Sequence, residues 1–187
     1  MHNSIQTQTL RRRELGVSLL DLLIATSLFF ILTAIAVPSF SHLLKKNQQK
    51  ETLYSIKQLL NYGRQEAVDR RETVVVCSSA DEMNCSSDWE HPFIVFVDKN
   101  RNNRLDEDET LLRSLDLLQP LQSLSWRSSL NKPFVHFDEN GSTRYQSGRI
   151  YYCDLSSDTN NYKAQLIVYR TGRVRIAPEA ELRNRCG

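Results

Sequence analysis

A long apolar run near the N-terminus constrains this chain more than any other feature of its sequence. The run extends from Val17 to Val37 and is closed by Pro38. Its polar residues are Ser18, Asp21, Thr26, Ser27 and Thr33. At a rise of about 1.5 Å per residue, a helix of this length spans about 31 Å, which matches the hydrocarbon core of a bilayer. The three arginines at positions 11–13 favour a cytoplasmic N-terminus.

Two simpler explanations of this run leave parts of it unexplained. An ordinary secretory signal has an apolar region of about 7–15 residues followed by a small-residue cleavage site. The present run is longer, and the sequence VPSF at positions 37–40 is a poor cleavage site. A plain membrane anchor accounts for the length but not for Asp21, because a carboxylate in lipid costs free energy.

The order of these features resembles the class III signal of type IV pilins and pseudopilins. A basic leader is followed by Gly16, an apolar helix with an acidic fifth residue, and a proline 22 residues after the glycine. The resemblance implies cleavage by a prepilin peptidase between Gly16 and Val17, and methylation of the new N-terminus at Val17. It also implies that Asp21, where the family normally has Glu, pairs with the N-terminal amine of a neighbouring subunit during assembly.

Charge is distributed unevenly along the part that follows the leader. Removal of residues 1–16 leaves 21 basic and 21 acidic residues, so the mature chain is formally neutral. Residues 81–109 nevertheless carry nine acidic and three basic side chains, and residues 141–187 carry eight basic and four acidic ones. This asymmetry predicts two different surfaces and an anionic partner for the C-terminal part.

Four cysteines follow the apolar run, at positions 77, 85, 153 and 186. The expected orientation places them outside the cytoplasm, where disulfides persist. Their spacing favours Cys77–Cys85 and Cys153–Cys186, although two other pairings are possible on number alone. A zinc site is the alternative, but the chain has no C-x₂-C pair.

The periodicity beyond Pro38 predicts one long helix followed by a β-sheet. Leu53, Ile56, Leu60, Gly63 and Ala67 recur at helical spacing and form an apolar stripe. We therefore expect a leader at 1–16, a membrane-spanning or filament-core helix at 17–38, its amphipathic continuation at 39–71, and a sheet domain at 72–187. The strand-like segments are Thr73–Cys77, Phe93–Asp98, Leu121–Trp126, Phe134–Phe137, Arg149–Asp154, Ala164–Arg170 and Arg173–Ile176. The segment Leu111–Leu118 is apolar and ambiguous. This α+β layering, a long N-terminal helix packed on an antiparallel sheet, is also the fold that the pilin resemblance implies.

A basic hairpin is predicted near the C-terminus, in the sequence LIVYRTGRVRIAP. With Thr171-Gly172 as a two-residue turn, Tyr169 would pair with Val174, and Arg170, Arg173 and Arg175 would share one face. Three guanidiniums on one face repel one another unless an anion or a carboxylate lies against them, and guanidinium forks suit phosphate. The alternative is a solvated face whose arginines pair with Glu179 or Glu181.

This segment and the anchor together resemble the GspH/FimT family, and most closely its FimT/FimU branch. The family carries a C-terminal G-R-x-R motif, here Gly172-Arg173-Val174-Arg175. In FimT-like members the motif is implicated in binding DNA during natural transformation, whereas FimU-like members share the motif and serve pilus assembly. The resemblance thus implies a double-stranded DNA contact through Arg170, Gly172, Arg173 and Arg175, or a role in assembly.

The segment Trp89–Arg113 is similar to a second landmark of that family, with Pro92, Phe93 and Asn103 where Gly, Trp and Gly are usual. Its polar residues Asp98, Asn100, Asn102, Asp106 and Glu109 fit positions 1, 3, 5, 9 and 12 of a calcium loop. Position 6 of such a loop should be Gly, and Asn103 stands there. A solvated loop rich in Asn and Asp is the alternative explanation.

No catalytic constellation is present in the sequence, so we expect neither an enzyme nor a cofactor. The resemblance implies a minor type IV pilin with other major and minor pilins, the prepilin peptidase and the inner-membrane assembly platform as partners. The precursor would be a single-pass inner-membrane protein with a periplasmic C-terminal domain, later transferred to the fibre. A GspH-type pseudopilin of type II secretion is the first alternative, and an unprocessed single-pass adhesin or receptor is the second.

Overall fold

The computed structural model describes residues 18–156, 163–183 and 186. The chain divides into two units, with the boundary between Leu43 and Leu44. The first unit contains the N-terminal half of helix α1 (Leu19–Arg70), and the second contains its C-terminal half together with every described strand.

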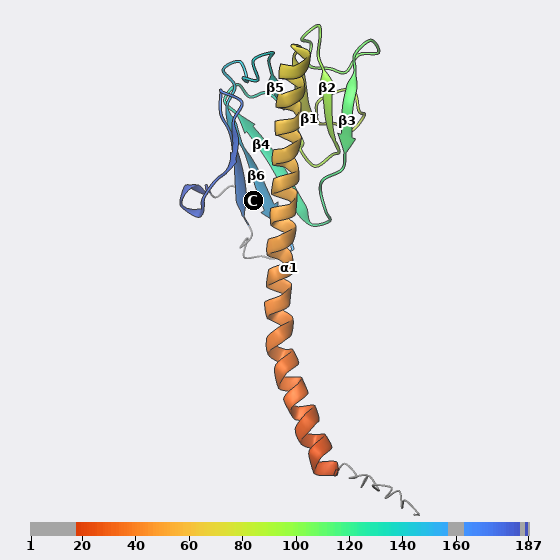
Figure 1. Cartoon of the computed structure of the whole chain (residues 1–187), viewed down its shortest axis with the longest axis vertical. Coiled ribbons are helices and arrows are strands. Elements are labelled where there is room, and N and C mark those ends of the chain that lie inside the picture. Colours follow the sequence, from red (N-terminus) through yellow and green to blue (C-terminus); the bar gives the residue numbers. More distant parts are fainter. Residues whose placement is uncertain (1–17, 157–162, 184–185, 187) are drawn as a thin grey trace, which may run out of the picture. The chain divides into compact units, whose positions relative to one another are not determined.

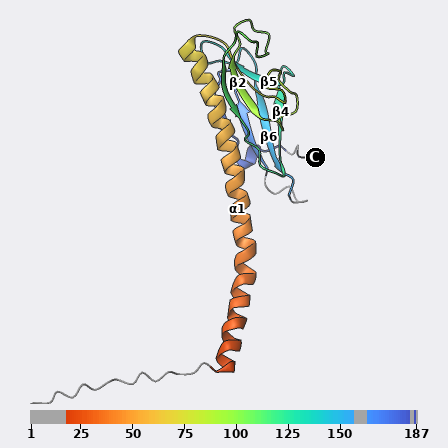
Figure 2. The same ribbon diagram turned by 90° about the vertical axis from the view of Figure 1, so that its right-hand side faces the viewer.

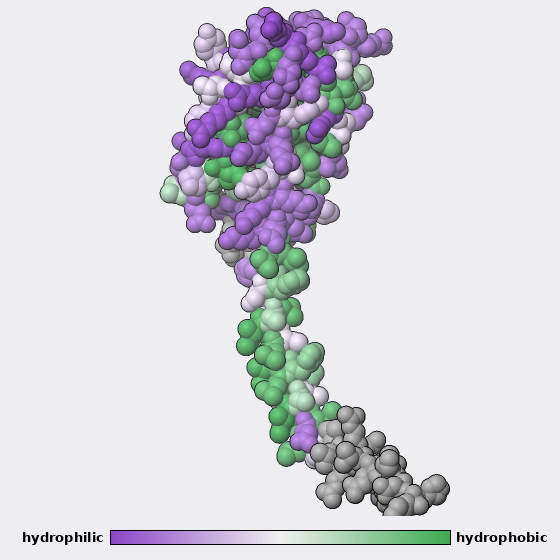
Figure 3. Space-filling model, in the orientation of Figure 1, coloured by the Kyte–Doolittle hydropathy of each residue, from purple (hydrophilic) through white to green (hydrophobic). Residues whose placement is uncertain are grey.

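The N-terminal half of α1 is apolar and exposed. An 18-residue window of α1 has a mean hydropathy of 2.3, none of it is buried, and the helix is long enough to cross a membrane. Figure 3 shows this half as mostly hydrophobic, with a few polar patches. The hydroxyls of Thr26, Ser27 and Thr33 donate to backbone carbonyls three or four residues earlier, at 2.9–3.1 Å. The polar groups of the apolar run are therefore satisfied inside the helix, as lipid requires.

Pro38 lies inside α1 without ending it, and the helix continues to Arg70. Arg71 then adopts a left-handed conformation with a φ of 56°. The Glu72 amide donates to the Ala67 carbonyl at 3.3 Å, which satisfies one of the last carbonyls of the helix. The helix predicted over residues 17–71 is confirmed within the described residues, and it ends one residue earlier than expected.

The strands form two antiparallel four-stranded sheets rather than the single sheet that we expected. The first sheet has the order β3-β2-β1-β5 and the second has the order β4-β6-β7-β8. The strands are β1 (Val74–Ser78), β2 (Phe93–Val97), β3 (Leu111–Leu115), β4 (Gln122–Ser128), β5 (Phe134–Phe137), β6 (Gly148–Asp154), β7 (Ala164–Val168) and β8 (Val174–Ile176), followed by the short 3₁₀ helix η1 (Glu179–Glu181). Each of the seven predicted strand-like segments overlaps a strand, and the ambiguous segment 111–118 contains β3.

One main core joins both sheets to the C-terminal half of α1. The helix contributes Leu53, Ile56, Leu60, Gly63 and Ala67, which are all buried, as the apolar stripe predicted. In Figure 1, β2 and β3 lie on one side of this half of the helix and β4 and β6 on the other; Figure 2 shows the sheets from a direction turned by 90°. The helix approaches β1 closely, because a Cβ atom at Gly63 would lie 2.6 Å from a methyl carbon of Val76.

Candidate functional site

The β7–β8 hairpin differs in register from the one that the sequence predicts. Val168 pairs with Val174, and the Tyr169 amide donates to the Arg173 carbonyl at 3.0 Å. The connection is thus a three-residue loop, Arg170-Thr171-Gly172, in which the Gly172 amide donates to the Tyr169 carbonyl and Gly172 has a φ of 75°. A loop of three residues ending in a left-handed glycine is a standard hairpin connection.

The change of register by one residue alters which residues of β7 and β8 share a face of the hairpin. The apolar face consists of Leu166, Val168, Val174 and Ile176, and these residues contact the main core. The outward face carries Ile167, Tyr169, Arg173 and Arg175. The predicted pairing of Tyr169 with Val174 was wrong, as was the grouping of Arg170 with the other two arginines. A slip of one residue moves the side chains of β7 to the opposite face relative to those of β8.

The tip of the hairpin is fixed to the loop between β5 and β6. The Thr143 amide donates to the Arg170 carbonyl at 3.0 Å, and the Thr143 hydroxyl lies within hydrogen-bond distance of the Tyr169 and Arg170 carbonyls. A Cβ atom at Gly172 would overlap the Gly141 carbonyl oxygen. The glycine of the G-R-x-R motif is therefore required by the close approach of two backbone segments.

Arg175 is held in place by its neighbours. Its Nε donates to the Tyr169 hydroxyl at 2.7 Å, and its Nη2 lies 2.6 Å from the Glu181 carboxylate. The hydrogen bond to Glu181, followed by that to Tyr169, raises the pKa of the Arg175 guanidinium. The sequence offered, as the alternative to an anion site, a solvated face whose arginines pair with Glu179 or Glu181. Arg175 does pair with Glu181, so this arginine has a structural role.

Arg170 lies apart from that face and lines a cleft. The cleft has a volume of about 980 Å³ and lies between the β2–β3 loop, the β5–β6 loop and the tip of the β7–β8 hairpin. Two further arginines line it, Arg101 and Arg144, as do His136 and Tyr145. The structure thus divides the predicted DNA-contact residues, with Arg173 and Arg175 on the outer sheet face and Arg170 in the cleft.

The proposed calcium loop follows β2, where Asp98 is buried. Its carboxylate accepts the backbone amides of Asn102 and Asn103 at 3.0 and 3.1 Å. Burial is the main cause that raises the pKa of Asp98; the charge of Glu109 adds to the rise and the Asn103 amide opposes it. Asn103 has a φ of 61° and so adopts the left-handed conformation for which a calcium loop uses glycine.

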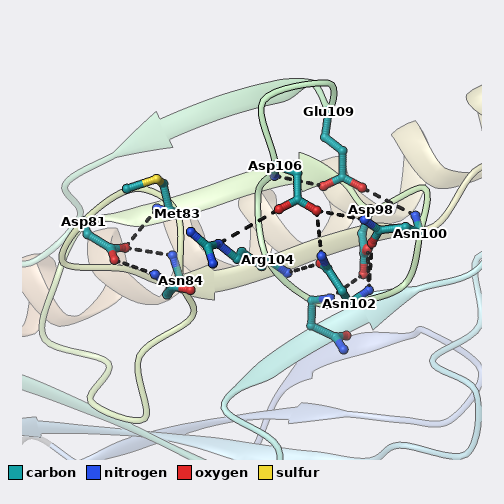
Figure 4. Close-up of polar contacts among 10 residues, drawn as sticks. Asp81, Met83, Asn84, Asp98, Asn100, Asn102, Arg104, Asp106 and Glu109 are labelled. Carbon is teal, nitrogen blue, oxygen red and sulfur yellow. Dashed lines mark hydrogen bonds and ion pairs between the residues drawn. The ribbon is translucent and has the colours of Figure 1, made fainter.

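Hydrogen bonds within the loop join its other polar residues, as Figure 4 shows. The side-chain amides of Asn100 and Asn102 donate to Asp106 at 2.8 and 2.6 Å and lower its pKa. Glu109 accepts the backbone amides of Lys99 and Asp106. Among the described residues, no three His, Cys, Asp or Glu side chains form a group that could hold a metal ion. These hydrogen bonds fit the loop rich in Asn and Asp that the sequence offered as the alternative, and calcium binding stays a prediction.

Both disulfides have the pairing that the spacing favours. Cys77–Cys85 ties β1 to the loop that follows it, and Cys153–Cys186 ties β6 to the C-terminal segment. The same C-terminal segment is held by Gln165, whose side-chain amide donates to the Arg183 carbonyl at 2.6 Å, and by Arg149, which donates to the Glu181 carbonyl at 3.3 Å. Glu181 is thereby kept beside Arg175.

The predicted processing site, Gly16 and Val17, lies outside the described residues. Asp21 is described, and it takes part in a reciprocal cap at the start of α1. The Ser18 hydroxyl accepts the Leu20 amide at 3.3 Å, and the Asp21 carboxylate accepts the Ser18 amide at 3.2 Å. Ser18 thus caps the second helical residue and Asp21 bonds back to Ser18, so Asp21 has a partner within its own chain at the start of α1.

Sequence reasoning missed Arg101, Arg144, Tyr145 and His136 as members of one cleft. They come from three separate segments, and no short motif joins them. The one local signal is the pair Arg144-Tyr145, whose φ angles of 42° and 71° place two non-glycine residues in the left-handed region. Such a pair cannot be recognised from residue types, because the turn normally uses Asn and Gly.

A family model and two solved structures match the chain. The model of the type II transport protein GspH matches residues 54–172. Two crystal structures of the type IV minor pilin FimU from Pseudomonas aeruginosa strain PAO1 are similar in fold, each with 17% sequence identity. Their TM-scores are 0.53 and 0.50, and the matches cover 72% and 71% of this chain and 92% and 94% of theirs. No curated protein matches the sequence significantly.

Proposed function

The chain belongs to the GspH family of type II transport proteins, and on that premise we propose that it is a minor type IV pilin. In this role it is a structural and interaction subunit of pilus biogenesis and carries out no catalysis. Its partners are other major and minor pilins, the prepilin peptidase and the assembly platform of the inner membrane.

The observation that carries this proposal is the exposed apolar half of α1 on a chain of this family. Large apolar side chains such as Leu19, Phe30 and Ile35 have more than 60% of their surface exposed. Water would penalise that surface by about 25 cal/mol per Å². A bilayer in the precursor, and the packed helices of neighbouring subunits in a fibre, both remove it from water. We therefore place the precursor in the inner membrane with one span and its sheet unit in the periplasm.

The hairpin supports a contact with double-stranded DNA as a second part of this role. Arg173 is exposed on the outward face, next to Arg175 and the ring of Tyr169. Guanidiniums that contact phosphates carry no base information, so this contact is independent of DNA sequence. Arg173 and Arg175, which share this face, would give a log–log salt slope near −1.8, at roughly −0.9 for each phosphate contact. Arg170 lines the cleft and does not contribute to this contact.

The experiment uses the full chain in detergent micelles and a labelled DNA duplex, with anisotropy recorded over a range of salt concentrations. Replacing Arg173 and Arg175 together by Gln should reduce the magnitude of the slope by about two. Arg113→Gln, on an exposed arginine of β3 in the other sheet, is the matched control. Equal binding of the duplex by the wild type and the double variant at low salt would rule out the DNA contact and leave assembly as the role of the hairpin.

A GspH-type minor pseudopilin of type II secretion is the second candidate, and the family match favours it. As a minor pilin the subunit would belong to a type IV pilus, and as a pseudopilin it would belong to the fibre of a type II secretion system. Deletion of the gene in its host separates them. Loss of surface pili with secretion intact supports the minor pilin, whereas retained pili with a block in protein secretion supports the pseudopilin. Complementation with the wild-type chain is the control for both readouts.

A further inference from the structure

The β5–β6 loop displays two side chains in a conformation that their residue types disfavour. Arg144 and Tyr145 occupy the centre of a turn in which the Gln146 amide donates to the Thr143 carbonyl at 2.9 Å. Both central residues have positive φ, a geometry that favours Asn-Gly over larger L residues. Residues held in such conformations gather at functional sites, and they persist only where their surroundings fix them.

The residues on either side of this turn fix it. Thr143 and Gln146 are fully buried. The Gln146 side-chain amide donates to the Phe134 carbonyl at 2.7 Å and to the Ser128 hydroxyl at 3.1 Å. The Thr143 hydroxyl donates to the Gln146 carbonyl and is also within reach of the hairpin carbonyls. The turn is therefore preorganised, and it presents Arg144 and Tyr145 in fixed positions.

Three guanidiniums without a carboxylate partner line the cleft that this turn borders. Arg101, Arg144 and Arg170 come from three different loops, and none of them takes part in the ion pairs found within residues 18–156, 163–183 and 186. Like charges gathered in this way repel one another, and guanidinium forks suit phosphate oxygens. The cleft is therefore suited to an anion.

Two carboxylates also line the cleft, and both are used by their own loops. Asp98 accepts the amides of Asn102 and Asn103. Asp138 accepts the amides of Asn140 and Ser142 at 3.0 and 2.9 Å and the Ser142 hydroxyl at 2.7 Å. Neither carboxylate forms an ion pair with the three arginines within the described residues. Burial raises the pKa of Asp138, but the hydrogen bonds from Ser142 and Asn140, helped by the charge of Arg144, lower it overall.

Two further features indicate a ligand larger than a simple anion. The ring of Tyr145 is 79% exposed, so it offers a flat apolar surface at the cleft. The Nε2 atom of His136 is buried and has no hydrogen-bond partner within the described residues, although His136 lines the cleft. A ligand that joins a phosphate to a planar group with hydrogen-bonding edges would engage all of these groups, and the volume of about 980 Å³ has room for it.

We propose that the cleft binds an unpaired nucleotide of a DNA strand, with its phosphate against Arg101, Arg144 and Arg170 and its base against the ring of Tyr145. This inference rests on the proposed function, because it takes DNA as the polymer that the hairpin contacts. Base stacking on an aromatic side chain requires an accessible base face, which a duplex covers. The cleft therefore selects single strands or strand ends, whereas the outer face of the hairpin contacts duplex phosphates.

The test replaces the turn by the residues that its backbone prefers. In the variant Arg144→Asn with Tyr145→Gly, the strain is relieved while a guanidinium and the ring are lost. The full chain in detergent is titrated with a labelled single strand of about 12 thymidines, within the usual range of such sites. We expect affinity to fall about tenfold or more, and the thermal midpoint to stay constant or rise. Arg113→Gln, on β3 of the other sheet, is the control that should bind as the wild type does.

The outcomes separate this inference from the proposed function. If the turn variant binds the single strand as tightly as the wild type, while the Arg173 and Arg175 double variant loses duplex binding, the cleft site is ruled out and the hairpin contact stands. If the wild type binds neither single strands nor duplexes at low salt, both are ruled out. A loss confined to single strands in the turn variant supports the cleft site.

Discussion

The α-carbon of Gly172 lies so close to the carbonyl oxygen of Gly141 that no Cβ atom fits between them. The carbonyl oxygen also accepts a hydrogen bond from Arg64 Nε at 2.9 Å, so α1 holds it in place. This contact fixes the hairpin tip against the β5–β6 loop. The first residue of the G-R-x-R motif is thus a packing requirement. Of the arginines that follow it, Arg173 is exposed, whereas Arg175 already contacts Tyr169 and Glu181.

Gly172→Ala should destabilise the sheet unit by about 2–4 kcal/mol, because it combines a left-handed backbone with an overlap against a fixed carbonyl. Urea unfolding followed by tryptophan fluorescence measures this, since Trp89 and Trp126 are both buried in the main core. Thr171→Ala, at an exposed position of the same turn, should change stability by less than about 0.5 kcal/mol. Equal midpoints for the two variants would show that the approach of the two backbones is not constraining.

The ion pair between Arg175 and Glu181 should limit the affinity of the hairpin for DNA. Glu181→Gln removes the carboxylate beside Arg175 and releases its charge for phosphate. We expect tighter duplex binding and a salt slope steeper by up to about 0.9. Glu179→Gln removes the same charge two residues away and serves as the matched control. Identical slopes for the two variants would mean that Glu181 does not compete with DNA for Arg175.

Much of the fold follows from the sequence, because its elements have strong local signals. The apolar stripe of Leu53, Ile56 and Leu60 marks the buried face of the helix, and β-branched runs such as Val74–Val76 mark strands. The hairpin register cannot be predicted from the sequence, because the residue types of Thr171-Gly172 also allow a two-residue turn. The contact of Gly172 with Gly141 favours the three-residue loop instead. That choice depends on Gly141, which lies 31 residues earlier in the chain.

The cleft shows a second limit of local reasoning. Arg101, Arg144 and Arg170 are far apart in the sequence, and only the packing of three loops gathers them. The charge asymmetry of the sequence predicts a basic surface from the C-terminal part, yet Arg101 comes from the acidic segment 81–109. Asp21 is different, because its position in the class III signal suggests assembly while its cap with Ser18 satisfies a local need.

His136 should make the sheet unit less stable in mild acid. Burial lowers the pKa of His136, the charge of Arg144 lowers it further, and Asp138 opposes them. Because the folded state binds the proton more weakly than the unfolded state does, stability is lost as the pH falls below about 6.5, the ordinary value. Urea unfolding at several pH values should show this slope, and His136→Gln should flatten it. A slope unchanged in that variant would assign the effect to other groups.

Arg144→Gln gives an independent check on the same histidine. Removing this positive charge should raise the pKa of His136 towards its ordinary value without restoring it fully, because burial is the larger cause. Chemical shifts of the ring protons during a pH titration measure the change directly. An unchanged His136 titration would contradict the placement of Arg144 beside it.

The two disulfides should differ in what they contribute to stability. In the chain-entropy model, a loop of about 9 residues contributes roughly 2.5 kcal/mol and one of about 34 residues roughly 3.8 kcal/mol. Replacing Cys153 and Cys186 together by Ala should therefore cost more than replacing Cys77 and Cys85. It should also release Glu181 from Arg175 and so steepen the salt slope for duplex DNA. Loss of stability in the reverse order would contradict this account of the C-terminal segment.

The central claim is that this chain is a pilin-type subunit, and processing tests it most directly. We would co-express the chain with a prepilin peptidase and analyse it by N-terminal sequencing and intact mass measurement. The product should lack 16 residues and begin at Val17. It should carry one added methyl group when the peptidase also methylates. Gly16→Leu should block cleavage, because the peptidase requires a small residue before the cut. A wild-type chain that remains intact, or that begins at any other residue, would contradict the claim.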